Sequence, residues 1–266
     1  MGSPFRLTPV ELIEKYGLEP VILGQALERI DARDVWFVGF SGKLGAGKDT
    51  VAPLAFDLLQ DSQHVRTDSF GLNLKEEFGK LIGLVQEQRG PRASGFSIED
   101  HFRVPQDQAM RVADIVWSEV NSGKLTNGFA KTPASRLGLQ YWATEVRRAQ
   151  DPLHWVKPVI QRTIEAAAQG VSTQLTDVRF FTEVWGVLDI GGFAVRLDVG
   201  EEEQSKRIFE RDGIGISEAA RSHSSETELD GFEHFTVRIQ TEDLSSVDEV
   251  ARIAGETVAA RASTLF

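Results

Sequence analysis

The feature that most constrains the fold is an apolar segment followed by a glycine-rich turn and a helical pattern, between Val35 and Phe56. Val35–Phe40 is rich in β-branched and aromatic residues, which predicts a strand buried on both faces. The next residues, Gly42-Lys-Leu-Gly-Ala-Gly47-Lys48, match G-x-x-x-x-G-K, and a helical pattern begins at Thr50. A strand, such a turn and a helix in this order predict a phosphate-binding loop rather than a glycine-rich surface turn.

The chemistry of this loop follows from its residue types. Glycines let backbone N–H groups turn inward around a phosphate, and Lys48 can reach the β- and γ-oxygens. Asp49 stands where Ser or Thr is usual, but Thr50 follows it and can serve the phosphate or a Mg²⁺ shell. Asp49 suits the first helical turn, where the helix dipole favours an acidic side chain. The predicted nucleotide-binding residues are Gly42, Lys43, Gly45, Ala46, Gly47, Lys48, Asp49 and Thr50, with Thr50 and Asp49 as candidate metal ligands.

Alternating patterns along the chain predict a parallel α/β sheet with right-handed crossovers. The expected strands are Val35–Phe40, His64–Asp68, Thr173–Val178, Phe193–Val199 and Phe235–Gln240. The expected helices are Thr50–Gln60, Leu74–Leu84, Gln106–Asn121, Ala134–Gln150, Pro152–Gln169, Glu201–Arg211 and Val247–Ala260.

The domain organisation predicted from these patterns is an N-terminal helical extension, residues 1–33, followed by one domain over 34–266. The gap between the second and third strands is too long for one crossover helix, so residues 70–172 should contain a mostly helical substrate-binding insertion. Within it, Gln86–Phe96 and Asn121–Pro133 are rich in Gly, Ser, Pro and charge and are expected to be loops.

Composition narrows the class of partner. A net charge of −11 makes a sequence-independent grip on nucleic acid unexpected, because such binding needs clustered Lys and Arg. The chain has no cysteine, which excludes thiol nucleophiles and zinc–thiolate sites and suits a reducing cytoplasm. No export signal and no membrane-spanning run is recognisable. We expect a cytoplasmic protein that binds small molecules; a homodimer is left open.

A phosphate-binding loop also occurs in GTPases and translocases. The guanine signature [NT]-K-x-D is missing from the sequence, and no run of four apolar residues leads into Asp-Glu. Asp189-Ile-Gly-Gly192 fits D-x-x-G, a pattern short enough to arise by chance. A small-molecule phosphotransferase is the class that remains.

Such an enzyme needs arginines that neutralise phosphates while water is excluded. Arg207 and Arg211 lie four apart in Glu203–Asp212 and should share one helical face. We expect both to act in catalysis as part of a lid, residues 201–231. The alternative is a solvated helix face on which they pair with Glu203 and Glu210.

Five further segments follow the loop in a fixed order, and together they resemble the deoxynucleoside monophosphate kinase family of tailed bacteriophages over residues 35–250. The loop itself, with one residue between Lys48 and Thr50, is similar to that of adenylate kinase. The resemblance implies a P-loop kinase fold, ATP and Mg²⁺ as cofactors, and transfer of the γ-phosphoryl to a deoxynucleoside monophosphate. The segments are Thr67–Lys75, Leu139–Arg147, Asp151–Trp155, Thr176–Phe180 and His223–Asp230.

The resemblance also implies residues that contact the acceptor. Arg179 would hold the acceptor phosphate, and Asp177 would orient Mg²⁺ or an arginine at the carboxyl edge of the sheet. The alternative is a buried salt bridge at a strand end. Asp68 and Lys75 lie in a segment that departs from the family pattern at residues 71–73. Lys75 fits either a phosphate contact or an exposed position at a helix start.

Two later segments complete the predicted site. In the helix Ala134–Gln150, helical spacing would put four polar side chains near one face, where they could contact the acceptor; they are Arg136, Gln140, Thr144 and Arg147. Trp142 is expected in the core. Glu226 is a candidate substrate contact in the lid, and Ser225 with Glu228 predicts a capping box.

Two other functions stay open. A kinase of another phosphorylated small molecule, of the dephospho-coenzyme A or phosphomevalonate type, would use the same loop. A regulatory or assembly protein could hold ATP without any acceptor.

Overall fold

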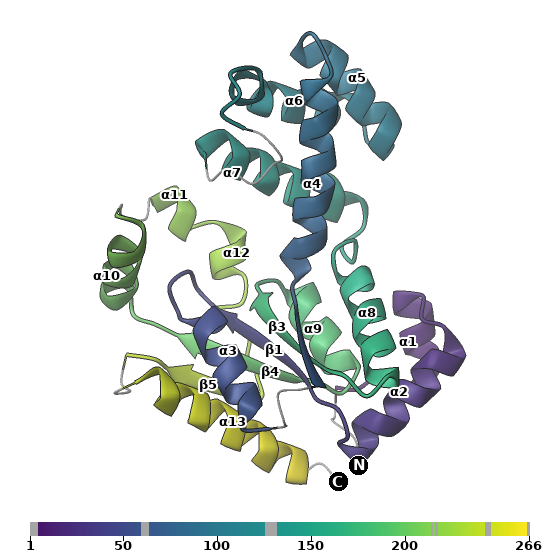
Figure 1. Ribbon diagram of the computed structural model, residues 1–266, viewed down its shortest axis with the longest axis vertical. Coiled ribbons are helices and arrows are strands. Elements are labelled where there is room, and N and C mark those ends of the chain that lie inside the picture. Colours follow the sequence, from purple (N-terminus) through teal and green to yellow (C-terminus); the bar gives the residue numbers. More distant parts are fainter. Residues whose placement is uncertain are drawn as a thin grey trace. The chain divides into compact units, whose positions relative to one another are not determined.

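The computed structural model describes residues 5–59, 64–125, 132–213, 215, 218–242 and 246–264 (Figure 1). Its strands form one five-stranded parallel sheet in the order β2-β3-β1-β4-β5. The predicted α/β class with a five-stranded parallel sheet is therefore confirmed. The strands are β1 Phe37–Gly42, β2 Val65–Asp68, β3 Ser172–Val178, β4 Phe193–Asp198 and β5 Val237–Gln240.

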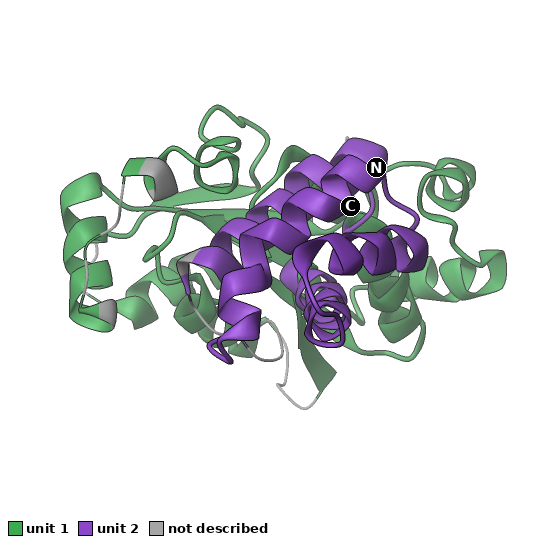
Figure 2. Cartoon of the chain, turned by 90° about the horizontal axis from the view of Figure 1, so that it is seen from above, with its two compact units in different colours: residues 1–70, 156–266 green, residues 71–155 purple. Residues whose placement is uncertain are grey.

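The chain forms two compact units (Figure 2). One contains the sheet, residues 1–70 and 156–266, and the other is residues 71–155. The expected insertion, residues 70–172, was too long at its carboxyl end. Helix α8 (Val156–Ala168) contacts β3 and α2 (Pro20–Ala32), so it belongs to the sheet unit.

Helices cover both faces of the sheet. Helices α3 (Lys48–Asp57) and α13 (Val247–Thr264) pack on one face, where Phe40 joins their apolar residues in a core. On the opposite face, Gly39 leaves room for α9 (Phe181–Asp189), because a Cβ there would lie 2.7 Å from Val187. Helix α9, which has nine residues, was not among the helices predicted from the sequence.

The N-terminal helices, α1 (Pro9–Tyr16) and α2, are part of the sheet unit. Thr8 and Glu11 form a capping box at the start of α1, and α2 packs on α8. At the end of α1, the Tyr16 hydroxyl donates to the buried Asp189, and Lys15 Nζ lies 2.7 Å from the same carboxylate. Burial, and then Asp189, raise the pKa of Tyr16 above its ordinary value. Asp189 is therefore an anchor for the N-terminal helices, which explains it without a D-x-x-G function.

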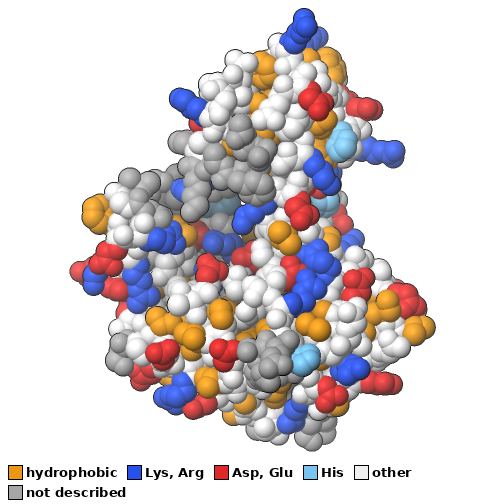
Figure 3. Space-filling model, viewed as in Figure 1, with side chains coloured by type: hydrophobic (Ala, Val, Ile, Leu, Met, Phe, Trp, Pro, Cys, Tyr) orange, Lys and Arg blue, Asp and Glu red, His pale blue; other side chains and the backbone are white. Residues whose placement is uncertain are grey.

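The remaining helices of the sheet unit follow β4: α10 (Glu201–Asp212), α11 (Glu218–Arg221) and α12 (Ser224–Thr227). No helix in the described part of the chain is long and apolar enough to cross a membrane. Figure 3 shows acidic and basic side chains interspersed over the visible face of this unit.

The second unit is helical. It comprises α4 (Phe70–Gln86), α5 (Pro91–Phe102), α6 (Gln106–Asn121), α7 (Pro133–Gln140) and a π-helix, η2 (Tyr141–Arg148). Its core includes Phe78, Leu81, Val116 and Trp142. Trp142 is fully buried, as predicted.

One expectation about this unit was wrong, and another was confirmed with a change of helix type. Gln86–Phe96 is not one loop, since α5 begins at Pro91. Gly95, one of the residues that suggested a loop, instead allows two helices to pack closely. A Cβ on Gly95 would lie 2.4 Å from Met110 Sδ of α6. The helix expected over Ala134–Gln150 changes to π geometry at Tyr141. Of the other expected loop, Asn121–Pro133, residues 126–131 lie outside the described residues.

Candidate functional site

The glycine-rich loop connects the carboxyl end of β1 to the first residue of α3. From β1 the chain passes to β2 on one side of the sheet, and from β3 it crosses β1 to reach β4 on the other. Open α/β sheets bind ligands at the carboxyl ends of strands where the connections diverge in this way. Gly42 is required by space, because a Cβ would lie 2.5 Å from the Leu197 carbonyl oxygen. Gly47 has a φ of 87°, which favours glycine.

Lys48 is the first residue of α3 and only 7% of it is exposed. Its ammonium group donates to the carbonyl oxygens of Gly42 at 2.6 Å and Lys43 at 3.0 Å. The pKa of Lys48 is lowered to about 7, mainly by burial and next by the nearby Arg179, while Glu226 and Asp49 act in the opposite direction. Lys48 is therefore a buried side chain that exchanges its proton near neutral pH, and other charged groups lie beside it.

Glu226 joins the loop to Arg179. Its Oε2 accepts a hydrogen bond from the Leu44 backbone N–H at 2.7 Å, and its Oε1 pairs with the Arg179 guanidinium. Glu226 belongs to α12 and is 9% exposed. The structure thus gathers three predicted site residues, Lys48, Arg179 and Glu226, around the same turn.

Arg196 is a buried charge that the sequence analysis missed. It lies in β4 and donates to Ser41 Oγ at 3.0 Å, with Asp198 at 3.0 Å and Asp230 at 2.9 Å as carboxylate partners. Asp230 also pairs with Lys43 of the loop at 2.9 Å. An arginine inside an apolar strand was the available signal, because a buried charge requires partners.

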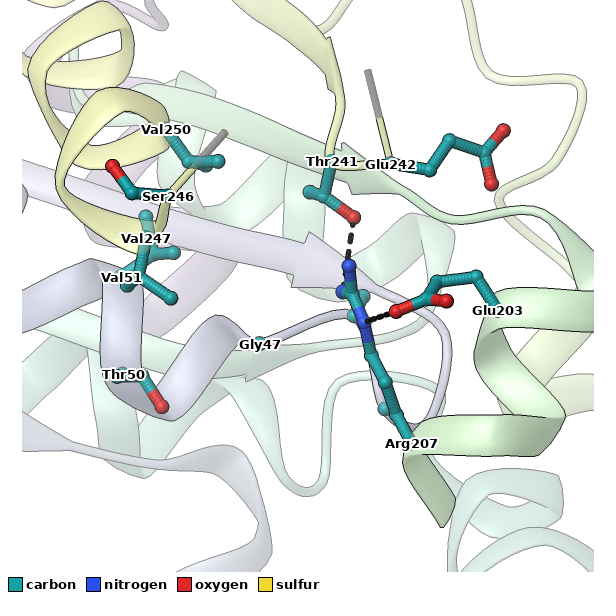
Figure 4. Close-up of a pocket in the computed structure, with 12 residues that line it drawn as sticks. Gly47, Thr50, Val51, Glu203, Arg207, Thr241, Glu242, Ser246, Val247 and Val250 are labelled. Carbon is teal, nitrogen blue, oxygen red and sulfur yellow. Dashed lines mark hydrogen bonds and ion pairs between the residues drawn. The ribbon is translucent and has the colours of Figure 1, made fainter. Parts of the chain in front are cut away.

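A cavity of about 500 Å³ lies directly beside the loop (Figure 4). One wall comes from the loop, α3 and the start of α13, and it combines valine side chains with Thr50 and Ser246. The opposite wall carries Arg207 of α10, whose Nε donates to Glu203 at 2.8 Å and whose Nη1 donates to Thr241 at 3.2 Å. The hydrogen bond from Arg207 lowers the pKa of Glu203. The apolar residues lining the cavity include Ala46, Val51, Val247 and Val250.

The two predicted lid arginines differ in placement. Arg207 is half-buried and lines the cavity, while Arg211 is exposed at the last turn of α10. Arg221, which was not predicted, connects α11 to α10 by donating to Ser205 Oγ at 2.6 Å. The predicted capping box of Ser225 and Glu228 was wrong: His223 caps α12, and Glu228 accepts from the Phe181 N–H at 2.7 Å.

Two predicted carboxylates make structural contacts. Asp68 is buried and pairs with Arg66 and with both Nε and Nη2 of Arg162, at 2.9 and 3.0 Å. Asp177 accepts from Ser69 Oγ and from the Phe70 N–H, both at 2.9 Å, and so holds the start of α4. These contacts account for both residues without a ligand, and Asp177 and Arg179 do not share a salt bridge among the ion pairs of the described residues.

The helical unit contains the other predicted acceptor contacts. Lys75 and Arg136 are exposed, and Gln140 and Thr144 are half-buried. The spacing that was expected to align this face is interrupted at Tyr141, because a π-helix has more residues per turn than an α-helix. The one-face arrangement therefore does not carry over to Thr144 and Arg147.

Arg147 is held inside the helical unit. Its Nε lies 2.5 Å from Glu77 Oε1, which also accepts from Trp142 Nε1 at 2.8 Å. The guanidinium carbon is 5.2 Å from the ring centre of Phe102 and 4.9 Å from that of Trp142. Burial raises the pKa of Glu77, but hydrogen bonds with His154, Arg147 and Trp142 outweigh it and lower the pKa. The contacts of Arg147 explain a 9% exposed arginine by charge pairing and aromatic packing alone.

The capacity of the site for a metal ion is small. In the part of the chain described, no three His, Cys, Asp or Glu side chains gather as ligands. Asp49 and Thr50 are exposed at the first turn of α3 and offer oxygen ligands. This donor set fits Mg²⁺ that arrives with a nucleotide, since that ion keeps mainly phosphate and water ligands.

Fold and site together define an α/β protein with a five-stranded parallel sheet and a glycine-rich loop at its carboxyl edge. No protein-family model matches the chain, and a search of curated proteins finds no relative. The function is therefore argued from the residues of the loop and their surroundings.

Proposed function

We propose that the chain is a P-loop kinase that transfers the γ-phosphoryl of ATP to a deoxynucleoside 5′-monophosphate, giving ADP and the diphosphate. The observation that carries the proposal is the cavity beside the glycine-rich loop. A loop that binds only inorganic phosphate does not need an adjoining cavity that is lined partly by apolar and partly by polar residues. A nucleotide needs both, because its polyphosphate tail and its base have opposite solvation.

The donor would bind with its tail on the loop and its nucleoside in the cavity. Backbone amides of residues 42–50 and the Lys48 ammonium supply positive charge to the tail. The Arg207 guanidinium and the apolar wall formed by Val247 and Val250 lie on different sides of the cavity, as Figure 4 shows. A planar base between them would gain both a cation–π contact and apolar burial.

The acceptor phosphate would be held by Arg179, which lies near Lys48. Transfer between two phosphates needs little base catalysis, because the attacking oxygen is already ionised near neutral pH. The protein therefore contributes positioning and charge neutralisation. Thr50 and Asp49 would hold Mg²⁺ that arrives with ATP, and the ion would supply positive charge that offsets the phosphates.

The choice of acceptor rests on the resemblance of the five segments to phage deoxynucleoside monophosphate kinases. The contacts of Asp68, Asp177 and Arg147 neither require nor favour a nucleotide, so these residues carry no part of the proposal. Lys75, Arg136, Gln140, Thr144 and Arg211 stay predictions. Another phosphorylated acceptor would fit the same loop and the same arginine at 179.

An acceptor panel tests the proposal. ADP formation from Mg²⁺·ATP is measured with the ribo- and deoxyribonucleoside monophosphates, dephospho-coenzyme A and phosphomevalonate. We expect acceptor-dependent ADP with one or more deoxynucleoside monophosphates. ADP only with a non-nucleotide acceptor would move the protein to that class of kinase. ATP binding without acceptor-dependent ADP would instead identify a nucleotide-binding regulatory protein.

A further inference from the structure

The Glu226 carboxylate occupies two hydrogen-bond donors that the proposed function assigns to phosphates. One of its oxygens accepts from the Leu44 N–H of the glycine-rich loop at 2.7 Å. The other pairs with the Arg179 guanidinium. A backbone amide of such a loop and an arginine are also the usual partners of a phosphoryl oxygen.

The contact differs from ordinary ion pairs on the surface. Glu226 is 9% exposed, and its side chain lies among charged groups that include Lys48 and Arg179. A mostly buried carboxylate with both oxygens engaged is held more firmly than an exposed one, because fewer of its contacts are exchanged with water. A phosphate that needs the same donors must therefore compete with it.

We propose that Glu226 is an internal substitute for phosphate that closes the ligand-free site and must be displaced when the nucleotide binds. The inference rests on the proposed function for the identity of the loop's ligand. It adds a form of regulation of that site: the residue lowers the affinity for polyphosphates and keeps Arg179 paired until a ligand engages the loop.

The displacement links the two halves of the site. Once a polyphosphate takes the Leu44 N–H, Glu226 loses one partner, and Arg179 becomes available to a second anion. Because one carboxylate bridges both donors, binding at the loop and binding at Arg179 favour each other. Glu226 belongs to α12, a helix of four residues, so a local change is sufficient to withdraw it.

The same segment offers a matched control. Glu228 lies two residues further along the chain and also accepts a hydrogen bond from a backbone amide, that of Phe181 at 2.7 Å. Phe181 is in α9, outside the glycine-rich loop. Glu228→Gln therefore removes the same charge from the same segment without touching the donors in question.

The test measures ATP binding by calorimetry for the wild type, Glu226→Gln and Glu228→Gln, with Glu226→Ala as a second variant and thermal melts to confirm folding. Replacing a charged acceptor by a neutral one removes a competitor worth about 1.4 kcal/mol or more, so we expect Glu226→Gln and Glu226→Ala to bind ATP about tenfold more tightly. Inorganic tripolyphosphate should show the same gain, because the effect concerns the tail and not the base. Glu228→Gln should bind as the wild type does.

The outcomes separate this inference from the proposed function. Equal or weaker ATP binding by folded Glu226 variants would overturn the inference and leave the kinase proposal standing, since the wild type still binds. An equal gain in Glu228→Gln would also overturn it, by showing a general effect of charge. Loss of ATP binding in every protein, wild type included, would overturn both proposals. Tighter ATP binding by the Glu226 variants than by the wild type, without acceptor-dependent ADP, would support the inference. It would at the same time contradict the kinase proposal.

Discussion

At the scale of single residues, the site is organised by charges that the fold has removed from water. Lys48 donates to two carbonyl oxygens of its own loop, and Arg196 is surrounded by a hydroxyl and two carboxylates. Each buried cation is satisfied by neighbours, as the cost of burying a charge requires. Lys48 therefore has a pKa of about 7. An anion that binds beside it can change its protonation near neutral pH.

ATP binding should therefore take up a proton through Lys48. At pH 8 the free protein holds this side chain mostly neutral, and a polyphosphate beside it favours the charged form. We expect uptake of about one proton at pH 8 and an affinity that falls between pH 7 and 9. Calorimetry in buffers of different ionisation enthalpy measures the uptake. Lys48→Met, with weaker residual binding, is the control and should show none; proton uptake that persists in it would assign the effect elsewhere.

The same pKa has a consequence for stability. The pKa of Lys48 is near 10.5 in the unfolded chain and about 7 in the folded protein, so the unfolded chain binds more protons between these values. The free energy of unfolding should therefore increase, because of Lys48, as the pH increases from 7 to 10. Unfolding in urea at both pH values, compared with Lys48→Met, checks the sign. A difference between the two proteins that does not change with pH would contradict it.

Arg179→Ala should reduce turnover by about 100-fold or more without unfolding the protein, because it removes the cation proposed to hold the acceptor phosphate. The measurement is kcat and KM for the best acceptor of the panel. Arg252→Ala is the matched control, since Arg252 forms an exposed pair with Glu256 at 2.7 Å on α13 and should leave turnover unchanged. Near-normal turnover in a folded Arg179→Ala protein would refute the acceptor assignment.

At the scale of elements, glycine has different meanings in the helices of the second unit. Gly95 of α5 allows close packing on α6, whereas Gly83 of α4 faces open space. The composition around Gly95 suggested a loop. The segment is helical instead, because α5 packs closely on α6. Helix α5 also buries Ser94 and Ile98 on either side of that contact.

A pair of substitutions tests this account. Gly95→Ala should destabilise the protein by about 1 to 3 kcal/mol, because its Cβ meets Met110 at both the sulfur and the backbone. Gly83→Ala should stabilise it by about 0.5 to 1 kcal/mol, since alanine loses less entropy in a helix. Urea unfolding followed by circular dichroism measures both. Equal effects of the two substitutions would show that packing at Gly95 is not the cause.

At the scale of the whole molecule, each of the two units has its own core. Asp177 holds the start of α4, where the chain passes from one unit to the other. The N-terminal helices join the sheet unit through α8 and through Asp189 of α9. Their contribution should therefore be to stability and not to nucleotide binding.

Tyr16→Phe examines that separation. It removes the hydroxyl that donates to the buried Asp189 and should cost about 1 to 3 kcal/mol of stability. The Kd for ATP should stay unchanged. Chemical denaturation and calorimetric titration measure the two quantities, with the wild type as the reference. A Kd that changes in proportion to the lost stability would indicate that the N-terminal helices act on the site.

The strands of the sheet and the glycine-rich loop could be predicted from the sequence, because both depend on local pattern. Apolar runs that alternate with helical patterns indicate a parallel sheet, and G-x-x-x-x-G-K between a strand and a helix predicts the phosphate-binding turn, although α3 begins at Lys48 and not at the expected Thr50. Which charged residues contact each other depends on the tertiary structure. Asp177 was expected to orient Mg²⁺ or an arginine, yet it holds the start of α4, while Arg179 pairs with Glu226, 47 residues away. Ion pairs between distant segments depend on how elements pack, and neither spacing nor composition carries that information.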